Sequence, residues 1–404
     1  MGIIVQKFGG SSVKNAERIK AVAQRVTAAR EAGWQVVVVL SAMGDTTDEL
    51  IAKAQQITSR PPRREMDMLL STGEQISIAL LAMAIDDMGY PVVSLTGAQV
   101  GIVTDSVHTK ARIQNVGTSR VEKELADGRI VIVAGFQGIN TENDITTLGR
   151  GGSDTTAVAL AAALRADVCE IYTDVDGVYT ADPRIISNAR KLSDISYGEM
   201  LEMASLGAVV LQPRSVEYAA MNDVRILVRN SYNGNDGTYV QGERQMEKDM
   251  LVVGIAHDIN VAKISITGLP DKPGVAYRIF SRMAAEGLNV DMIVQTNKEG
   301  ARADITFSIS RDDAQRALEI TEQIKTELGA EAVLIDKTLA KVSIVGAGMV
   351  TNPGVAARMF EALAEQEINI HIISTSEIKV SCLIDEGRVK DAVKVVHDKF
   401  GLAE

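Results

Sequence analysis

Cysteine and histidine are scarce in this 404-residue chain, which has two cysteines and four histidines. The cysteines, Cys169 and Cys382, stand far apart and outside any Cys-x-x-Cys motif, so the sequence indicates neither a disulfide framework nor a zinc site. No two histidines stand four residues apart, the spacing that places two imidazoles on one helix face for a metal. We therefore expect a protein of a reducing compartment, the cytoplasm, with no directly bound metal.

An excess of positive charge and long apolar runs are also missing. Lysine and arginine number 42 against 53 aspartates and glutamates, a net charge of −11, which argues against a protein that binds nucleic acid. The longest apolar runs, such as residues 78–85, fall far short of the roughly 18 residues of a membrane-spanning helix. The first residues run directly into a strand-like segment, so we expect neither a secretory signal nor a membrane anchor.

The composition that remains is that of a folded protein, with 46% hydrophobic and 24% charged residues. At roughly 100 to 200 residues per domain, the length predicts two to four domains. Strand-like runs alternate with helical patterns, which predicts a mostly parallel sheet covered by helices on both faces. The strand-like runs are residues 2–8, 35–41, 92–95, 130–134, 168–173 and 225–228, and the helical patterns include 15–31, 65–88, 119–126 and 154–165.

The α/β pattern ends in a polar, turn-rich stretch at residues 230–249, where we place the domain linker. An internal repeat follows it. The pattern PGVA-x-R-x-F at 273–280 returns 80 residues later at 353–360, and SI-x-G at 265–268 returns at 343–346. Each copy predicts strand, Pro-Gly loop, helix, strand, strand and helix, a split β-α-β-β-α-β sandwich of one sheet and two helices.

Two glycine clusters are candidates for anion binding. Residues 7–12, KFGGSS, follow the first strand directly, where glycines allow close backbone approach and a lysine and two hydroxyls supply donors. Read alone, this cluster fits a tight strand-to-helix turn as well as a phosphate site. Residues 149–156, GRGGSDTT, precede an alanine-rich helix whose first amides favour an anion, and Arg150 adds a planar fork suited to a carboxylate.

Neither glycine cluster is a Walker loop or a Rossmann fingerprint. The chain contains no Gly-Lys dipeptide, and Asp154 occupies the position of the third glycine of Gly-x-Gly-x-x-Gly. The sequence therefore gives no support for a P-loop or a Rossmann cofactor site.

Two further segments contain carboxylates at positions where a ligand could bind. Residues 71–75, STGEQ, put Glu74 before or within a long helix, where it could bind a substrate ammonium or simply cap the helix or lie on the surface. Residues 172–184, YTDVDGVYTADPR, follow a buried strand at the edge where α/β sheets bind ligands, although a plain surface turn also fits. Their spacing is not that of a calcium loop.

Together these four motifs resemble those of the aspartokinases, of the amino acid kinase family. The resemblance covers the whole chain, because the paired repeats resemble ACT domains. Glutamate 5-kinase, acetylglutamate kinase and uridylate kinase resemble the chain in fold but are not expected to combine this set with paired ACT repeats. The resemblance implies a three-layer α/β/α catalytic domain at residues 1–245 and ACT domains at 262–337 and 338–404, the second completed by a strand at 250–257.

The resemblance also implies a reaction. ATP and L-aspartate would give 4-phospho-L-aspartate, the first step toward lysine, threonine and methionine, with Mg²⁺ carried by the ATP phosphates. The side-chain carboxyl of aspartate, with a pKa of about 3.9, is already a nucleophile at neutral pH, so no general base is needed. The protein would instead align the reactants and neutralise phosphate charge.

The resemblance assigns roles residue by residue. Lys7, toward the γ-phosphate, and Asp154 would be catalytic, while Arg150 would bind the α-carboxylate of aspartate and Glu74 its α-ammonium. The full set for aspartate is Thr47, Glu74, Arg150, Gly151, Gly152 and Ser153. The set for ATP is Lys7, Phe8, Gly9, Gly10, Ser41, Thr173, Asp174, Tyr179, Asp182 and Arg184.

The ACT repeats imply feedback inhibition by lysine, threonine or both. Effector residues would be Asp271, Gly274, Ala276, Asn289, Val290, Asp291 and Gln295 in the first repeat, and Val355, Ala356, Asn369, Ile370, Ser376 and Glu377 in the second. We expect a homo-oligomer, a dimer through the ACT domains, or an assembly with a shorter ACT-only chain, for which Met246 and Met250 are possible starts.

Two alternative functions stay open at this point. The chain could be a catalytically inactive amino-acid sensor, although Lys7, Glu74, Arg150 and Asp154 are all present. It could also be another carboxylate kinase of the same fold, acting on glutamate or acetylglutamate in place of aspartate, or a nucleotide kinase.

Overall fold

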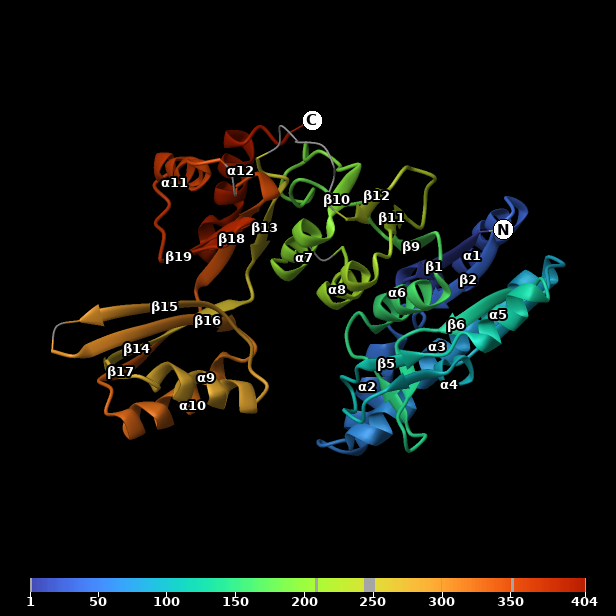
Figure 1. Ribbon diagram of the computed structural model, residues 1–404, viewed down its shortest axis with the longest axis horizontal. Helices are drawn as coiled ribbons and strands as arrows, with labels where there is room; N and C mark the ends of the chain where they lie inside the picture. The colour runs from blue at the N-terminus through green and yellow to red at the C-terminus, as the bar shows by residue number, and fades with distance from the viewer. Residues whose placement is uncertain (1, 208–209, 243–250, 299, 350–351, 404) are drawn as a thin grey trace. The chain divides into compact units, whose positions relative to one another are not determined.

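The computed structural model describes residues 2–207, 210–242, 251–298, 300–349 and 352–403. These residues divide into two compact units (Figure 1). The first contains residues 2–179, 191–205 and 210–242; the second contains 180–190, 206–207 and the described residues from 251 onward.

The first unit is built around an eight-stranded sheet in the order β10-β12-β11-β9-β1-β2-β6-β3. β10 and β12 run opposite to the other six strands, which are parallel to one another, so the predicted mostly parallel sheet is confirmed. The strands are β1 (Ile3–Phe8), β2 (Gln35–Leu40), β3 (Val92–Leu95), β6 (Ile130–Ala134), β9 (Val168–Thr173), β10 (Asp194–Ser196), β11 (Ile226–Asn230) and β12 (Thr238–Gln241).

Helices cover both faces of this sheet because its central strands are apolar on both sides. Ile4 and Val38 belong to one core cluster with Val22 and Leu81 of the helices α1 and α3, whereas Val37, from the opposite face of β2, is equally buried. The helix α6 packs against β1, β2 and β9. The helices of this unit are η1 (Gly10–Val13), α1 (Ala16–Glu31), α2 (Thr46–Ile57), α3 (Arg63–Asp87), α4 (Gly97–Val100), α5 (Ser119–Ala126), α6 (Gly152–Leu164), α7 (Tyr197–Ser205) and α8 (Pro213–Asn222).

A second, smaller sheet lies within the first unit, in the order β5-β4-β7-β8. Its strands are β4 (Ile102–Thr104), β5 (Ile113–Val116), β7 (Gln137–Ile139) and β8 (Ile145–Thr147). The sequence did not predict this sheet, because strands of three or four residues are too short to show an alternating pattern. The sheet matters for the site, since β8 leads directly into the second glycine cluster.

Among the described helices, only α3 has the length and composition that could cross a membrane. Its buried positions, however, include the carboxylates of Asp67 and Glu74, and it packs against α1, β3, β6 and β8. Buried, partnered polar groups and contacts to two sheets are properties of a core helix in a folded α/β domain.

The second unit contains two four-stranded sheets, β15-β16-β14-β17 and β13-β18-β20-β19. Each has the expected repeat order, and β13 pairs antiparallel with β18, adding a strand to the second repeat from outside it. The strands are β13 (Gly254–Asp258), β14 (Val261–Pro270), β15 (Val290–Lys298), β16 (Arg302–Ser310), β17 (Ala332–Asp336), β18 (Leu339–Val345), β19 (Ile372–Thr375) and β20 (Lys379–Asp385). The helices are α9 (Val275–Ala285), α10 (Ala314–Leu328), η2 (Ala347–Met349), α11 (Val355–Glu365), η3 (Glu386–Arg388) and α12 (Val389–Lys399).

The segment 180–190 belongs to the second unit, although its sequence interrupts the first. The carbonyl oxygen of Thr180 accepts a hydrogen bond from the amide of Ile255 at 2.7 Å. Its hydroxyl donates to the carbonyl oxygen of Leu402 at 3.0 Å and lies 3.0 Å from Nε2 of His397, which is fully buried. The segment is thus built into the second repeat at both its sheet and its C-terminal helix.

The linker predicted at 230–249 is partly wrong. Residues 238–241 form β12, which lies inside the eight-stranded sheet with Thr238 and Val240 buried. The turn-rich composition of residues 230–249 predicted a linker, although these residues include a four-residue strand. Residues 243–249 of the predicted linker, with Met246, lie outside the described residues, as does Met250.

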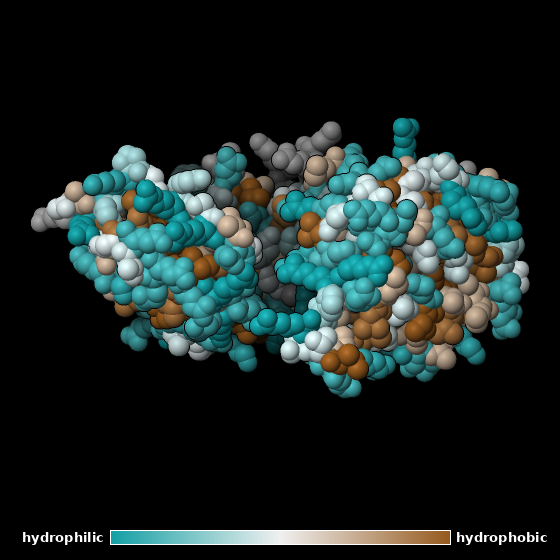
Figure 2. Space-filling model, turned by 90° about the horizontal axis from the view of Figure 1, so that it is seen from below, coloured by the Kyte–Doolittle hydropathy of each residue, from teal (hydrophilic) through white to brown (hydrophobic). Residues whose placement is uncertain are grey.

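Figure 2 shows one face of the molecule, on which hydrophobic patches interrupt a mostly hydrophilic surface. Large exposed hydrophobic side chains occur in both units. Ile76, Leu80 and Met83 follow one side of α3, and Ile293 and Val294 lie on β15, at the edge of its sheet. Each set is a candidate contact surface for another chain.

Candidate active site

A buried ion pair connects the two predicted glycine clusters. Lys7, near the end of β1, places its Nζ 2.6 Å from Oδ1 of Asp154 in the first turn of α6, and their side chains are only 12% and 11% exposed. The chain turns just after β1, and η1 then holds Ser12, whose hydroxyl is buried without a hydrogen-bond partner among the described residues. A fixed cation and an unused hydroxyl at the end of a central strand suit a phosphate group.

Glycine is required at two positions that pack against Ala42. A Cβ on Gly10 would lie 2.7 Å from the carbonyl oxygen of Ala42, and a Cβ on Gly73 would lie 2.8 Å from the Cβ of Ala42. Ala42 follows β2, so the first glycine cluster and α3 both approach the end of that strand. Neighbouring parallel strands bring their carboxyl ends to one edge, which is why segments far apart in sequence meet here.

Glu74 lies within α3, in the turn that approaches Ala42. Its Oε1 accepts a hydrogen bond from the amide of Ala42 at 3.1 Å, and its Oε2 is buried with no partner among the described residues. Burial raises the pKa of Glu74 to about 8. A buried carboxylate with an unused oxygen suits a bound cation such as an ammonium, which would return the group to its ionised form.

Arg150 lies in the turn between β8 and α6 and is exposed. Gly149 and Gly151 on either side have positive φ angles of 78° and 72°, and the amide of Gly152 donates to the carbonyl oxygen of Gly149 at 2.9 Å. Within the described residues the guanidinium of Arg150 forms no ion pair, so it is available to a ligand anion. Ser153, in the first turn of α6, is buried, and Thr47 is half-buried near the start of α2.

The predicted nucleotide residues are divided between the two units. Phe8, Gly9, Gly10, Ser41, Thr173, Asp174 and Tyr179 belong to the first unit, with Asp174 exposed. Asp182 and Arg184 belong to the segment 180–190 of the second. There the Arg184 guanidinium donates to both carboxylate oxygens of Asp182 and holds the pKa of that carboxyl below its usual range.

Sequence reasoning missed a loop that contacts the first glycine cluster. The hydroxyl of Tyr232 donates to the carbonyl oxygen of Ser11 at 3.1 Å, and the guanidinium carbon of Arg18 lies 4.1 Å from the centre of the Tyr232 ring. Asn230 and Asn233 donate to Oδ1 of Asp176 in the loop after β9. This loop lies in the stretch predicted to be the linker. Its run of Asn and Gly residues indicates a loop, and the asparagine amides bond to a neighbouring turn.

The structure brings together four of the effector residues predicted in the first repeat. Asp271, Gly274, Ala276 and Gln295 line a cavity of about 330 Å³ at the N-terminal end of α9. Asp291, in contrast, is used by the protein itself, since its Oδ2 lies 2.5 Å from Nζ of Lys341 in the second repeat. Of the other two, Asn289 is exposed before β15, and Val290 opposes Ile309 in the sheet.

The residues predicted in the second repeat are spread more widely. Val355 is buried at the start of α11, followed by the half-buried Ala356, and Asn369 is exposed. Ile370 lines a separate cavity of about 380 Å³, shared with residues of β14, β15 and β16. Ser376 and Glu377 form the exposed turn between β19 and β20.

Comparison with known proteins gives the class first. Residues 2–230 match the amino acid kinase family, and residues 264–323 and 342–400 each match an ACT domain. The aspartokinase of Mycolicibacterium smegmatis is 52% identical over 407 residues, covering 100% of this chain and 97% of the relative. The chain therefore belongs to the aspartokinases of the amino acid kinase family, as its motifs predicted.

Two solved structures are similar to this chain over nearly its whole length. E. coli aspartokinase III in complex with aspartate and ADP matches with a TM-score of 0.82 and 26% identity, covering 98% of this chain and 99% of that chain. The complex of E. coli aspartokinase III with lysine and aspartate, described as the T-state, matches with a TM-score of 0.77 and 25% identity, over 98% and 99% of the two chains.

Proposed function

We propose that this chain transfers the γ-phosphoryl group of ATP to the side-chain carboxylate of L-aspartate and forms 4-phospho-L-aspartate. The observation that carries the proposal is the meeting of two sites at Ala42. The carbonyl oxygen of Ala42 lies against Gly10 of the first glycine cluster. The amide of Ala42 donates a hydrogen bond to Oε1 of Glu74, whose Oε2 has no partner among the described residues. Kinship to aspartokinases over the full chain supports the same reaction.

Each side chain has a definite task in this reaction. Lys7 neutralises charge on the γ-phosphate, and Asp154 holds the Lys7 ammonium in place. Glu74 binds the α-ammonium of aspartate, and Arg150 binds its α-carboxylate in a two-pronged contact. Because both contacts hold the end of the substrate that does not react, its side-chain carboxylate is left free to attack phosphorus in line.

Mg²⁺ fits the site as a companion of the nucleotide. Among the described residues, no group of three histidine, cysteine, aspartate or glutamate side chains could hold a metal ion. As the resemblance implies, the phosphate oxygens would carry the cation, with Asp154 as the acidic partner of Lys7. When bound, Mg²⁺ neutralises charge that develops on the phosphates.

Trapping of the acyl phosphate tests the reaction. With ATP, Mg²⁺ and hydroxylamine, we expect aspartate to give a hydroxamate at a rate far above that with glutamate or acetylglutamate. Equal rates with glutamate or acetylglutamate would support another carboxylate kinase of this fold, phosphorylation of a nucleotide would support a nucleotide kinase, and no hydroxamate with any acceptor would support an inactive amino-acid sensor. ATP hydrolysis without acceptor is the background measurement.

The cavity at the start of α9 supports feedback inhibition by an amino acid. Backbone amides at a helix N-terminus suit an effector carboxylate, and Asp271 and Gln295 in the cavity lining suit an ammonium or amide group. The entry position of the reaction in lysine and threonine synthesis makes lysine, alone or with threonine, the expected effector. Inhibition further requires that the effector bind the active and inactive arrangements unequally.

We expect saturating lysine, alone or with threonine, to lower the rate of acyl phosphate formation. Asp271→Ala should raise the lysine concentration for half-inhibition about tenfold, the usual size of one lost charged contact. The measurement compares each variant with its own uninhibited rate. Full activity of the wild type in both amino acids together would rule out this regulation.

The ACT units also support an oligomer, either a dimer of this chain or an assembly with a shorter ACT-only chain. Within the described ranges the edge strand β15 pairs with β16 alone, and it exposes Ile293 and Val294. An exposed apolar edge is a template for pairing with another strand. We place the reaction in the cytoplasm, in keeping with Cys169 and Cys382, which are both free.

A further inference from the structure

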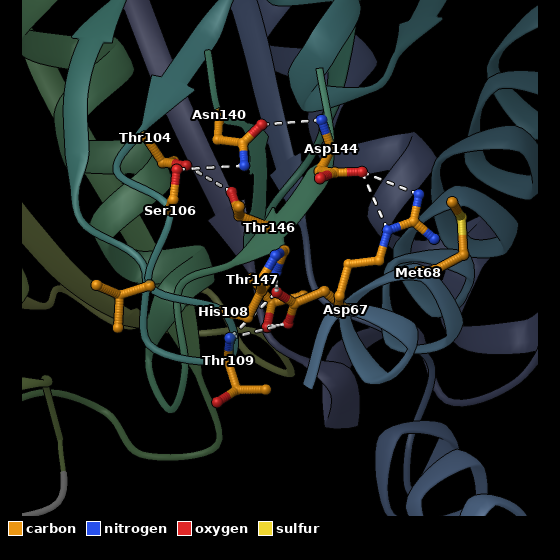
Figure 3. Close-up of polar contacts among 12 residues, drawn as sticks. Asp67, Met68, Thr104, Ser106, His108, Thr109, Asn140, Asp144, Thr146 and Thr147 are labelled. Atoms are coloured by element: carbon orange, nitrogen blue, oxygen red, sulfur yellow. Dashed lines mark hydrogen bonds and ion pairs between the residues drawn. The ribbon is translucent and has the colours of Figure 1, made fainter. Parts of the chain in front are cut away.

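Asp67 is the most deeply buried carboxylate of α3, with no exposed side-chain surface. It lies 2.6 Å from Nδ1 of His108 and accepts hydrogen bonds from the amide of Thr109 at 3.1 Å and from Oγ1 of Thr147 at 2.5 Å (Figure 3). A carboxylate without access to water is tolerated only when its oxygens are bonded in this way. Asp67 therefore holds two separate segments of the small sheet against α3.

The first of these segments is the loop between β4 and β5, which contains His108 and Thr109. The second is the end of β8, because Thr147 is its last residue. The two are also joined to each other, since the amide of Ala111 donates to the carbonyl oxygen of Thr147 at 2.9 Å. Asp67 thus holds two segments that are also bonded to each other. Thr147, which Asp67 contacts, is only three residues before Arg150.

The loop and the strand end continue into the turn that carries Arg150. A Cβ on Gly149 would lie 3.1 Å from the carbonyl oxygen of Thr109, so the turn packs against the same loop. From the other side, Arg214 of α8 donates from Nη1 to the carbonyl oxygen of Leu148 at 3.0 Å and from Nη2 to that of Ala111 at 2.8 Å. The base of the turn is therefore held from two helices.

Asp67 also shares its helix with Glu74. The two carboxylates are seven residues apart, about two helical turns, so α3 forms a rigid connection between them. At one end of this connection, Glu74 bonds to Ala42 after β2. At the other end, Asp67 bonds to Thr147, at the base of the turn that carries Arg150. The separation of Glu74 and Arg150 consequently depends on the contacts of Asp67.

We infer that Asp67 is a positioning residue for aspartate, which sets the distance between Glu74 and Arg150 through Thr147 and the loop at Thr109. This inference rests on the proposed function, in which those two residues bind the α-ammonium and α-carboxylate. Asp67 is fully buried and bonded to protein groups, so it acts through them, and Arg214 supports the same turn from α8. Aspartate affinity, and not ATP affinity, is the property that this arrangement controls.

The test is a comparison of Michaelis constants in the full chain. Asp67→Asn should raise the KM for aspartate about tenfold or more, the scale expected when a binding group is displaced by a fraction of an ångström to one ångström, and change the KM for ATP less than twofold. Thr147→Val keeps the side-chain shape but removes one donor, and should show the same selective rise if Asp67→Asn fails to fold. Comparable rises for both substrates, or none in either variant, would overturn the inference.

Asp144→Asn is the matched control. Asp144 also joins the small sheet to α3, since it accepts hydrogen bonds from Arg64 at 2.9 and 3.0 Å, but both side chains are partly exposed. It precedes β8, away from the Arg150 turn. We expect both Michaelis constants of this variant to stay within twofold of the wild type. A rise in the aspartate KM equal to that of Asp67→Asn would mean that any contact between α3 and the small sheet has this effect, and would overturn the inference.

A double-mutant cycle separates this inference from the proposed function. Arg150→Ala alone should raise the aspartate KM about a hundredfold, and adding Asp67→Asn to it should change that KM less than twofold, because the residue acts through Arg150. If Arg150→Ala has its effect but the two changes multiply, only the role of Asp67 is wrong. If Arg150→Ala leaves the aspartate KM unchanged, the proposed role of Arg150 fails, and that of Asp67 with it.

Discussion

Lys7→Ala is expected to lower kcat by about 10³-fold, or about 4 kcal/mol of barrier, while the fold is retained. Phosphoryl transfer involves little covalent chemistry for the protein, so a fixed cation on the transferred group supplies a large part of the rate. Lys7 is the largely buried cation near the end of β1, held by Asp154. The measurement is single-turnover formation of acyl phosphate at saturating ATP and aspartate.

Loss of Lys7 also leaves Asp154 buried without its cation, which is destabilising. The double variant Lys7→Ala, Asp154→Asn removes both charges and should recover most of the lost thermal stability but none of the activity. Lys14→Ala, at an exposed lysine just after η1, is the control for lost surface charge. Turnover of the Lys7→Ala protein within tenfold of the wild type would reject the catalytic role of Lys7.

The KM for aspartate should rise as the pH falls below about 8, by up to tenfold per pH unit. Burial raises the pKa of Glu74 to about 8, so in the free enzyme this carboxyl is mostly protonated at pH 7. Only its ionised form attracts the α-ammonium of aspartate, and binding must therefore release a proton. The measurement is aspartate KM from pH 6 to pH 9, with ATP KM as the internal control.

Glu74→Gln should remove this pH dependence and raise the aspartate KM about a hundredfold at pH 9, where the wild-type carboxylate is ionised. A pH slope that persists in Glu74→Gln would assign the titration to another group. The raised pKa has a second consequence for the folded protein, which holds a proton that the unfolded chain releases near pH 4.5. The contribution of Glu74 to stability is thus lost as the pH rises from about 4.5 to about 8, and Glu74→Gln should flatten that dependence.

The larger elements of the fold were predictable because their patterns are long. Strands such as β1 and β2 are runs of β-branched residues buried on both faces, and α1 shows Ile19 and Val22 at helical spacing. The two repeats were visible from identical residues around their Pro-Gly loops. The resemblance named Lys7 and Asp154 as catalytic residues, but their ion pair was not predicted, since no local pattern joins residues 147 positions apart.

The parts that escaped prediction are short or depend on distant contacts. β4, β7 and β8 have three residues each, and β12 lies in a stretch of turn residues. Asp67 resembles any surface carboxylate of an amphipathic helix in sequence, and only the fold shows that His108 and Thr147 surround it. The division of the predicted nucleotide residues between two units was equally hidden, because Asp182 follows Tyr179 by only three positions.

The placement of residues 180–190 has a consequence for anyone who dissects this enzyme. Ala181, Ile186 and Ala189 are buried in the second unit, where Ala189 forms a β-bridge with Ala403 near the C-terminus. A fragment ending near residue 245 would keep this stretch but lose Ile255, His397, Leu402 and Ala403, which contact it, and would expose more of its apolar side chains to water. A single cut in the sequence therefore does not separate the two units, because residues 180–190 are built into the second one and contact residues near the C-terminus.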